Sequence, residues 1–569
     1  MCTRLASHYL RRQFCLVIAA VLLCPGYLVA QTAPDAGSVL QQIEQQQRKP
    51  LPQQAAPMFV PPAPMQSLGG ATVTVTEFRF AGNTLLASPQ LALSVAKFVG
   101  RPIGFSELQD AAVAVADAYR QAGWVVRAYL PKQEITDGSV TIQIIEATFG
   151  AVHVEGGGTR VSAARLTNII TTAQTAGAPL NVRALDRGLL LINDLPGVLA
   201  TGRLAPGRYQ AESDLVIALE DGPAVSGNVT VDDAGSRFTG EERLIAAASL
   251  NGPLHIGDRA DGLLLHSEGS DYQRVGYSLP VGSRGIRVGA NASHLTYDIV
   301  TSDFTALDAH GTSDTVGLEA SYPLLRSRLK NVYLGLNADD KQFDNSSAGI
   351  TTTKYSAQTA TLGLYANSFD SWLGGGSNTA SLALVRGRID LGGSPNESID
   401  ALTTRTAGSF NKVRYSLSRL QVLTDRFSMY ANLSGQTASK NLDSSEKFYL
   451  GGPAGVRAYP QDEGSGSEGM LLNLEVRARL PANFGMTAFV DAGRVRINKD
   501  NDILGGVADN TADLKGGGLS ASWTASFGLT LQATVSRRIG RNPNPTSTGE
   551  DQDGSLTMNR FWLQASMPF

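Results

Sequence analysis

Cysteine is nearly missing from this chain of 569 residues. Its three cysteines are Cys2, Cys15 and Cys24, and none follows them. A secreted chain without further cysteine does not depend on a disulfide framework for its fold. Long apolar runs are equally scarce, because only one occurs, near the N-terminus, and the mean hydropathy is −0.07. Several membrane-spanning helices are therefore excluded, since each needs about 20 mostly apolar residues.

The sequence also lacks the patterns of common enzyme and cofactor sites. It has no P-loop and no G-x-S-x-G elbow, and its histidines are scattered without metal-ligand spacing. Residues 464–469 fit G-x-G-x-x-G, but no buried strand precedes them and no helix follows, so we interpret them as a loop. The net charge of −3 gives no indication of a nucleic-acid partner. We expect no catalytic, cofactor-binding or metal-binding residue, and not an enzyme.

The apolar run at the N-terminus is typical of a secretory signal peptide. Three arginines precede an apolar segment at residues 14–23, which Pro25 and Gly26 end. We predict that residues 1–30 are the signal, with Ala30 as the last residue before cleavage. The alternative is a retained anchor, which the break at Pro25 makes too short to span a membrane.

The next segment, residues 31–70, is rich in Gln, Ala and Pro. Residues 35–49 favour one short helix with Val39, Leu40 and Ile43 on a shared side. A proline-rich stretch follows, which is typical of an extended spacer. Composition alone leaves open the alternative that the whole segment is a disordered leader.

Residues 71–149 have the pattern of a small α/β domain. An alternating strand is expected at residues 73–80, followed by two helices and two more strands. Ser106, with Gln109 three residues later, fits a capping box at the start of the second helix.

Residues 150–222 repeat this β-α-α-β-β plan. Asn181 is placed to cap the second helix of the repeat, and Pro196 with Gly197 ends it. The two consecutive units predict two small domains of related architecture.

From residue 223 to residue 569, alternating strands recur between clusters of Gly, Asn, Asp and Ser. Apolar and polar residues alternate at 472–480, 529–536 and 561–569, so one face of each strand suits lipid and the other suits a polar lumen. A membrane strand needs roughly 9–11 residues. Divided among strands of this length and their connections, residues 223–569 predict a membrane β-barrel of about sixteen antiparallel strands, with fourteen or eighteen as alternatives.

Several short segments resemble one family of outer-membrane proteins. They are Phe-Arg-Phe-Ala-Gly-Asn at 78–83, Tyr-Leu-Pro-Lys-Gln at 129–133, Asn-Asp-Leu-Pro-Gly at 193–197, and Leu-Gly-Gly-Pro-Ala-Gly-Val-Arg-Ala-Tyr-Pro at 450–460 with Phe-Val-Asp-Ala-Gly at 489–493. Together with the order of parts, they resemble the transporters of two-partner secretion, the TpsB or haemolysin secretion/activation family. The resemblance implies two POTRA domains, at 71–149 and 150–222, before a barrel at 223–569.

The resemblance also implies a function and a location. It predicts a Gram-negative outer-membrane protein with periplasmic POTRA domains, which recognises a large secreted β-rich protein and exports it through the barrel without ATP. The partner would be an adhesin, a cytolysin or a haem-binding protein. Outer-membrane lipid and the barrel-assembly machinery are the other expected partners. Two alternatives stay open: an insertase that assembles other outer-membrane proteins, and a diffusion porin or adhesin.

The resemblance places residues 450–460 on a loop folded into the barrel. Alternation independently directs Asp491 into the lumen, because its apolar neighbours on the strand must face lipid. Arg457 is the expected partner, since a guanidinium makes two charge-assisted hydrogen bonds to a carboxylate. We therefore predict that Arg457 and Asp491, flanked by Val456 and Tyr459, anchor this loop. Ala458 stands where the superfamily often has glycine, so a left-handed backbone is not expected there.

Two further roles follow from the resemblance. The helix that carries Val39, Leu40 and Ile43 would plug the resting pore. Phe569, with Phe561 on the same face of the last strand, would form the C-terminal signal for barrel assembly.

Overall fold

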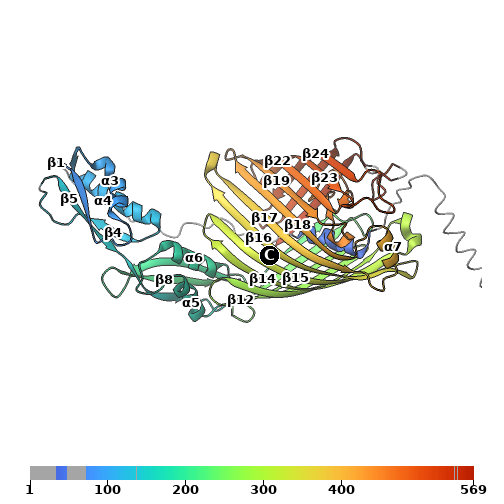
Figure 1. Ribbon diagram of the computed structural model, residues 1–569, viewed down its shortest axis with the longest axis horizontal. Helices are drawn as coiled ribbons and strands as arrows, with labels where there is room; N and C mark the ends of the chain where they lie inside the picture. Colours follow the sequence, from blue (N-terminus) through green and yellow to red (C-terminus); the bar gives the residue numbers. More distant parts are fainter. Residues whose placement is uncertain (1–33, 48–71, 136, 544, 547–548, 556) are drawn as a thin grey trace, which may run out of the picture.

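The computed structural model describes residues 34–47, 72–135, 137–543, 545–546, 549–555 and 557–569. The expected signal peptide and nearly all of the proline-rich stretch lie outside these residues. Two small domains and a large barrel follow one another along the long axis of the molecule (Figure 1). No helix in the described ranges combines the length and apolarity needed to cross a membrane.

The first small domain is built around a three-stranded sheet of order β2-β5-β4, in which β2 and β5 are parallel. Two helices pack on it through a core that includes Leu108, Val115 and Tyr119, all spaced for one helical face. Its elements are β1 (Thr72–Thr74), β2 (Glu77–Ala81), α3 (Ser88–Val95), η1 (Ala96–Phe98), β3 (Pro102–Gly104), α4 (Phe105–Ala122), β4 (Val126–Tyr129) and β5 (Ser139–Glu146).

Two local expectations for this domain are wrong. Helix α4 begins at Phe105, so its N-cap is Gly104 and not Ser106, and the Glu107 side chain accepts a hydrogen bond from the Gly104 N–H at 3.3 Å. The strand expected at 73–80 is divided into β1 and β2, because Val75 is fully buried and β1 pairs with β3 instead of the main sheet.

The second small domain repeats this architecture, with sheet order β6-β8-β7 and a parallel β6–β8 pair. The Asn181 side chain accepts hydrogen bonds from the backbone N–H groups of Arg183 and Ala184, so it caps α6 as expected. Its elements are β6 (Thr148–Gly156), α5 (Ala163–Ala173), α6 (Val182–Asn193), β7 (Val198–Pro206) and β8 (Glu212–Asp221).

Sixteen of the described strands form one closed antiparallel barrel, which confirms the predicted fold class. They are β9 (Val225–Asp232), β10 (Arg243–Asn251), β11 (Arg259–Ser267), β12 (Ser270–Val281), β13 (Ile286–Asp298), β14 (His310–Arg326), β15 (Lys330–Ser347), β16 (Ile350–Asp370), β17 (Gly376–Asp390), β18 (Gly408–Val422), β19 (Phe427–Ala438), β22 (Glu468–Arg479), β23 (Phe484–Arg496), β24 (Thr511–Thr524), β25 (Thr530–Arg538) and β26 (Asn559–Pro568).

The barrel strands alternate between an apolar outer face and a polar or packed inner face. On β26, Phe561 and Leu563 are exposed on the outside, whereas the Trp562 between them is buried. Strand β26 closes the barrel by pairing with β9, and Phe569 extends the seam through reciprocal backbone hydrogen bonds with Gly227 of 2.9 and 3.0 Å. The Phe569 ring lies so close to Gly227 that a Cβ there would meet it at 2.2 Å.

The second small domain contacts the turns at one end of the barrel. Arg326 pairs with Asp194 at 2.7 Å, and Arg328 pairs with Asp186 at 2.6 Å. Both acidic residues belong to the α6 segment, and both arginines lie at the turn between β14 and β15. The resemblance to outer-membrane transporters implies that this end is periplasmic and that the loops at the opposite end of the barrel face the cell exterior.

Candidate functional site in the barrel lumen

The connection between β19 and β22 turns back into the lumen. It carries η4 (Ser444–Glu446) and a two-residue hairpin of β20 (Phe448–Tyr449) and β21 (Ser465–Gly466). Leu450, Val456 and Tyr459 of this connection are completely buried and pack against inward residues of β22, β23 and β24. We call residues 450–464 the lumen loop.

The lumen loop folds tightly on itself before it reaches the wall. The Val456 N–H donates to the Leu450 carbonyl at 2.7 Å, and the Gly455 N–H donates to the Gly452 carbonyl at 3.0 Å. A Cβ at Gly455 would lie 1.9 Å from the Leu450 oxygen, so only glycine fits this turn. The turn places Arg457 at the loop tip.

The Arg457 side chain reaches a carboxylate on β23. Its Nε donates to Asp491 Oδ2 at 2.9 Å and its Nη2 donates to Oδ1 at 2.7 Å, which is a two-point pair. The Arg457 backbone N–H also donates to Oδ2 at 3.1 Å, and Asn473 Nδ2 donates to Oδ1 at 2.8 Å. Asp491 has no solvent-exposed side-chain surface. Four donors therefore surround one buried carboxylate.

Two more inward side chains complete the surroundings of Arg457. Its Nη1 lies 2.9 Å from Glu475 Oε1 on β22, and its guanidinium lies 3.5 Å from the centre of the Phe489 ring. The Arg457 carbonyl accepts hydrogen bonds from Ser536 Oγ at 2.7 Å and Trp562 Nε1 at 2.8 Å. Side chains from β22, β23, β25 and β26 thus hold one loop residue.

The residues next to Arg457 fix the rest of the tip. Ala458 has no left-handed backbone, as expected, and its Cβ packs where β24 has Gly516. The Tyr459 ring is fully buried and lies 4.4 Å from the Arg538 guanidinium, which also donates to the Ala458 carbonyl at 3.1 Å. Arg538 in turn forms a buried ion pair with Asp551 of the β25–β26 loop.

Helix α2 (Ala36–Gln46) also lies inside the barrel, where Figure 1 shows it as an isolated blue segment. Its N-terminus is capped by Asp35, whose side chain accepts from the Ser38 N–H at 2.8 Å. Val39, Leu40 and Ile43 are buried, and they pack against inward residues of several strands. These residues are Leu265, Tyr272, Leu295, Tyr297, Phe343, Tyr355, Val385 and Phe410.

Glutamines fasten the other side of α2 to the β19–β22 connection. Gln41 and Gln45 donate to the Lys447 carbonyl at 3.2 and 3.1 Å. Gln42 donates to Asp462 of the lumen loop at 2.7 Å. Among the described residues of α2, Glu44 forms an ion pair with Lys341 of β15 at 2.8 Å. Helix and loop therefore touch each other as well as the wall.

The sequence pattern did not identify several of these partners. Glu475 lies on the polar phase of β22, so alternation directs it inward, but nothing local indicates that Arg457 contacts it. Asp462 and Trp562 carry no motif, and their contacts depend on how the loop folds. Across the described ranges, no group of three or more His, Cys, Asp or Glu residues is placed to hold a metal ion.

Comparisons with known proteins agree with this architecture. The family described as "Haemolysin secretion/activation protein ShlB/FhaC/HecB" matches residues 211–515, and "POTRA domain, ShlB-type" matches residues 73–147. The heme/hemopexin transporter protein HuxB of Haemophilus influenzae is 27% identical, covering 98% of this chain and 100% of the relative. The outer membrane transporter CdiB of Dickeya dadantii (strain 3937) is 25% identical, covering 89% of each.

A solved structure shares the fold. CdiB from Escherichia coli superposes with a TM-score of 0.71 over 95% of this chain and 100% of that chain, at 21% identity. BamA from Haemophilus ducreyi, lacking its POTRA domains 1–3, superposes with a TM-score of 0.52 at 14% identity over 88% of this chain. Both likenesses concern the fold alone.

Proposed function

The chain belongs to the haemolysin secretion/activation family of outer-membrane transporters, which export a large partner protein by two-partner secretion, and we propose how its parts divide this work. In our proposal the lumen is the export route, the lumen loop is its anchored wall, and α2 is its removable plug. The observation that carries the proposal is the Arg457–Asp491 pair, because it fixes the loop tip against β23 through a buried carboxylate.

Cargo recognition falls to the two small domains, which we assign to residues 71–149 and 150–222 as first and second POTRA. Each three-stranded sheet has two edge strands, β2 and β4 in the first and β6 and β7 in the second. An extended cargo segment can add to such an edge through backbone hydrogen bonds, with little demand on its side chains. Strand β7 also exposes Leu199 on its surface.

We propose a large β-rich cargo of the adhesin, cytolysin or haem-binding class. A haem-binding cargo is supported by the name of the Haemophilus influenzae relative, a heme/hemopexin transporter. No P-loop is present in the sequence, so export draws on cargo folding outside the cell and not on nucleotide hydrolysis. The apolar barrel exterior contacts outer-membrane lipid, and Phe561 and Phe569 on β26 offer the barrel-assembly machinery its C-terminal signal.

A secretion assay tests this division of work. We would measure cargo in the medium with wild-type protein, without it, and with Arg457→Ala, at matched levels of folded barrel. The matched control is Arg494→Ala, which breaks an Arg–Asp pair of 2.5 Å between β23 and β24 that lies largely in solvent. We expect secretion with wild type and the control, and its loss with Arg457→Ala, because Asp491 is left buried without its cation, whereas Glu475 keeps Arg477.

The other outcomes separate the alternatives. Equal secretion by Arg457→Ala and wild type contradicts the role of the loop anchor. Cargo that stays in the membrane as a folded barrel, with none released, favours an insertase. If the cargo is released equally when the transporter is absent, this outcome favours a diffusion porin or adhesin.

A further inference from the structure

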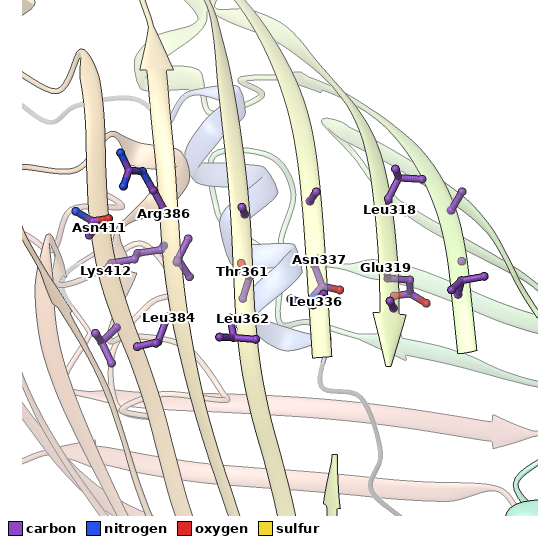
Figure 2. A pocket seen from close by; sticks show the side chains of 18 of the residues that line it. Leu318, Glu319, Leu336, Asn337, Thr361, Leu362, Leu384, Arg386, Asn411 and Lys412 are labelled. Atoms are coloured by element: carbon purple, nitrogen blue, oxygen red, sulfur yellow. The ribbon is translucent and has the colours of Figure 1, made fainter. Parts of the chain in front are cut away.

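An apolar trough of about 910 Å³ crosses the outer face of the barrel from β12 to β18. Its floor is low where β13, β15 and β16 place Ala290, Ala338 and Ala360 on the outside. Leucines that are each more than 40% exposed form its sides, and Figure 2 labels them along successive strands. They are Leu318, Leu336, Leu362 and Leu384. This surface faces lipid and is separate from the lumen.

Strand register shows that the trough runs obliquely between the two membrane surfaces. One row of directly paired residues joins Ala290 to Leu318, Leu318 to Ala338, Ala338 to Ala360 and Ala360 to Arg386. Ala290 lies near the periplasmic start of β13, whereas Arg386 lies near the extracellular end of β17. The trough therefore rises from the periplasmic side toward the outer leaflet, and Arg386 stands at its upper end.

Two arginines occupy this upper end on the lipid-facing side of β17. Arg386 and Arg388 share the exposed phase of the strand with Leu382 and Leu384. Figure 2 shows Arg386 beyond Leu384 along β17, beside Asn411 of β18. An arginine on the lipid face destabilises a barrel strongly near the bilayer centre and only slightly at the interface. The position of these arginines near the extracellular end of β17 agrees with this dependence on depth.

The cross-strand neighbours of the two arginines are uncharged. Arg386 lies opposite Ala360 and Asn411, and Arg388 lies opposite Gln358 and Ser409. Asp390 follows on the same face, but its Oδ1 accepts a hydrogen bond from the Gly392 N–H at 3.0 Å. Within the described ranges, neither arginine has an ion pair or a side-chain hydrogen bond.

Two other outward-facing basic side chains of this wall have an acidic partner, which Arg386 and Arg388 lack among the described residues. Lys354 lies 3.0 Å from Asp344 on the neighbouring strand, and His294 lies 2.7 Å from Asp314. The upper end of the trough thus combines two available guanidinium groups with an apolar channel below them. A ligand that fits must carry an anionic group above and a long apolar chain beneath.

We propose that this trough is a binding site for lipid A, the phosphorylated acylated disaccharide of the outer leaflet. An acyl chain lies over Ala338 and Ala360 between the leucines, where it removes apolar surface from contact with less ordered lipid. A phosphate lies between Arg386 and Arg388, since a guanidinium binds phosphate through two parallel charge-assisted hydrogen bonds. The extracellular position of the arginines selects an outer-leaflet lipid. This site does not depend on the division of work proposed above.

Native mass spectrometry of the full-length protein in detergent tests the proposal. Wild type, the double variant Arg386→Gln/Arg388→Gln and a control, Arg537→Gln, would each be titrated with diphosphorylated lipid A. Arg537 is exposed near the extracellular end of β25, on the outward phase, away from the trough. We expect binding about tenfold weaker in the double variant and unchanged in the control, which corresponds to the loss of charge-assisted hydrogen bonds. A second variant, Ala360→Phe, fills the trough floor and should weaken binding while both arginines remain.

Three results would overturn the proposal. One is equal binding by the double variant and the Arg537→Gln control. Another is equal affinity of the wild-type protein for lipid A with and without its phosphates, a comparison that needs no variant to fold. The third is phosphatidylglycerol binding as tightly as lipid A, which would assign the site to phospholipid. The heat-dependent shift of the folded barrel on a gel verifies that each variant is intact.

Discussion

The lumen loop and helix α2 occupy the same cavity but are held by different physics. The loop tip depends on a buried carboxylate, Asp491, with four donors, two of them from the Arg457 guanidinium. The helix depends mainly on apolar packing of Leu40 and its neighbours and on glutamine amides, and its one ion pair among the described residues, Glu44 with Lys341, has a partly exposed carboxylate. Removing one partner of a buried ion pair costs far more than breaking a neutral hydrogen bond. This difference supports our proposal that the loop is part of the wall and the helix a detachable occupant.

The largest effect should come from removing the buried ion pair that attaches the lumen loop to the wall, so that the loop is held no more strongly than α2. Asp491→Ala leaves Arg457 with Glu475 alone, and breaking a buried pair costs about 3–5 kcal/mol, less where water enters. We expect the loop to be cleaved by an added protease much faster than in wild type.

The matched control for that experiment is Asp513→Ala, which removes the partner of the exposed Arg494. Cleavage at the same rate in both variants would mean that Asp491 does not hold the loop. The two regions would then no longer differ in the way described above.

A smaller effect should follow from loosening the helix. The Leu40 residue is only 1% exposed. Replacing a buried leucine with alanine lowers stability by about 2–5 kcal/mol. With Leu40→Ala we expect more frequent open events in planar bilayers, approaching the conductance of a chain that lacks residues 31–50. The control is Gln47→Ala, because Gln47 is exposed at the C-cap. If neither Leu40→Ala nor the deletion raises conductance, α2 does not plug the pore.

The smallest expected effect is a dependence of the stability of the lumen loop on pH. Burial raises the pKa of Glu463, in the lumen loop, to about 7, although its carboxylate accepts a hydrogen bond from the Gln552 N–H at 2.8 Å. The folded loop thus holds the proton more tightly than an unfolded chain, whose pKa is 4.5. This stabilisation of the folded loop is fully present below pH 4.5 and is lost as the pH rises through about 7.

Loop cleavage should therefore be slower at about pH 5 than at about pH 8. Glu463→Gln keeps the shape of the side chain and should remove this difference. A pH dependence that is equal in wild type and Glu463→Gln would assign it to another group.

Local pattern predicted much of the fold. Alternation alone directed Asp491 inward, Asn181 was recognised as a helix cap, and the closed barrel of sixteen strands was expected from strand length. The cap at Ser106 was wrong because the helix begins two residues earlier than expected, where the Glu107 side chain accepts a hydrogen bond from the Gly104 N–H. The roles of Arg457 and α2 in transport stay predictions.

The contacts of the site that the sequence did not predict join residues far apart in the chain. Gln42 contacts Asp462 across 420 positions of sequence, and Trp562 reaches the Arg457 carbonyl across 105. A periodic pattern predicts on which face of a strand or helix a side chain lies, but it does not predict which distant segment contacts that side chain. Glu475 illustrates the limit, since its inward direction was readable and its partner was not.

Residues 48–71 join α2 covalently to β1, and this tether changes what α2 needs in order to stay bound. A tethered segment competes at an effective concentration of about millimolar when the chain spans the gap, however weak its own affinity. Glutamine amides and a few apolar contacts then suffice to keep the lumen occupied. If α2 is the plug that we propose, an arriving polypeptide needs no specific sequence to displace it, because many weak contacts along an entering chain outweigh the fixed local concentration of one short helix.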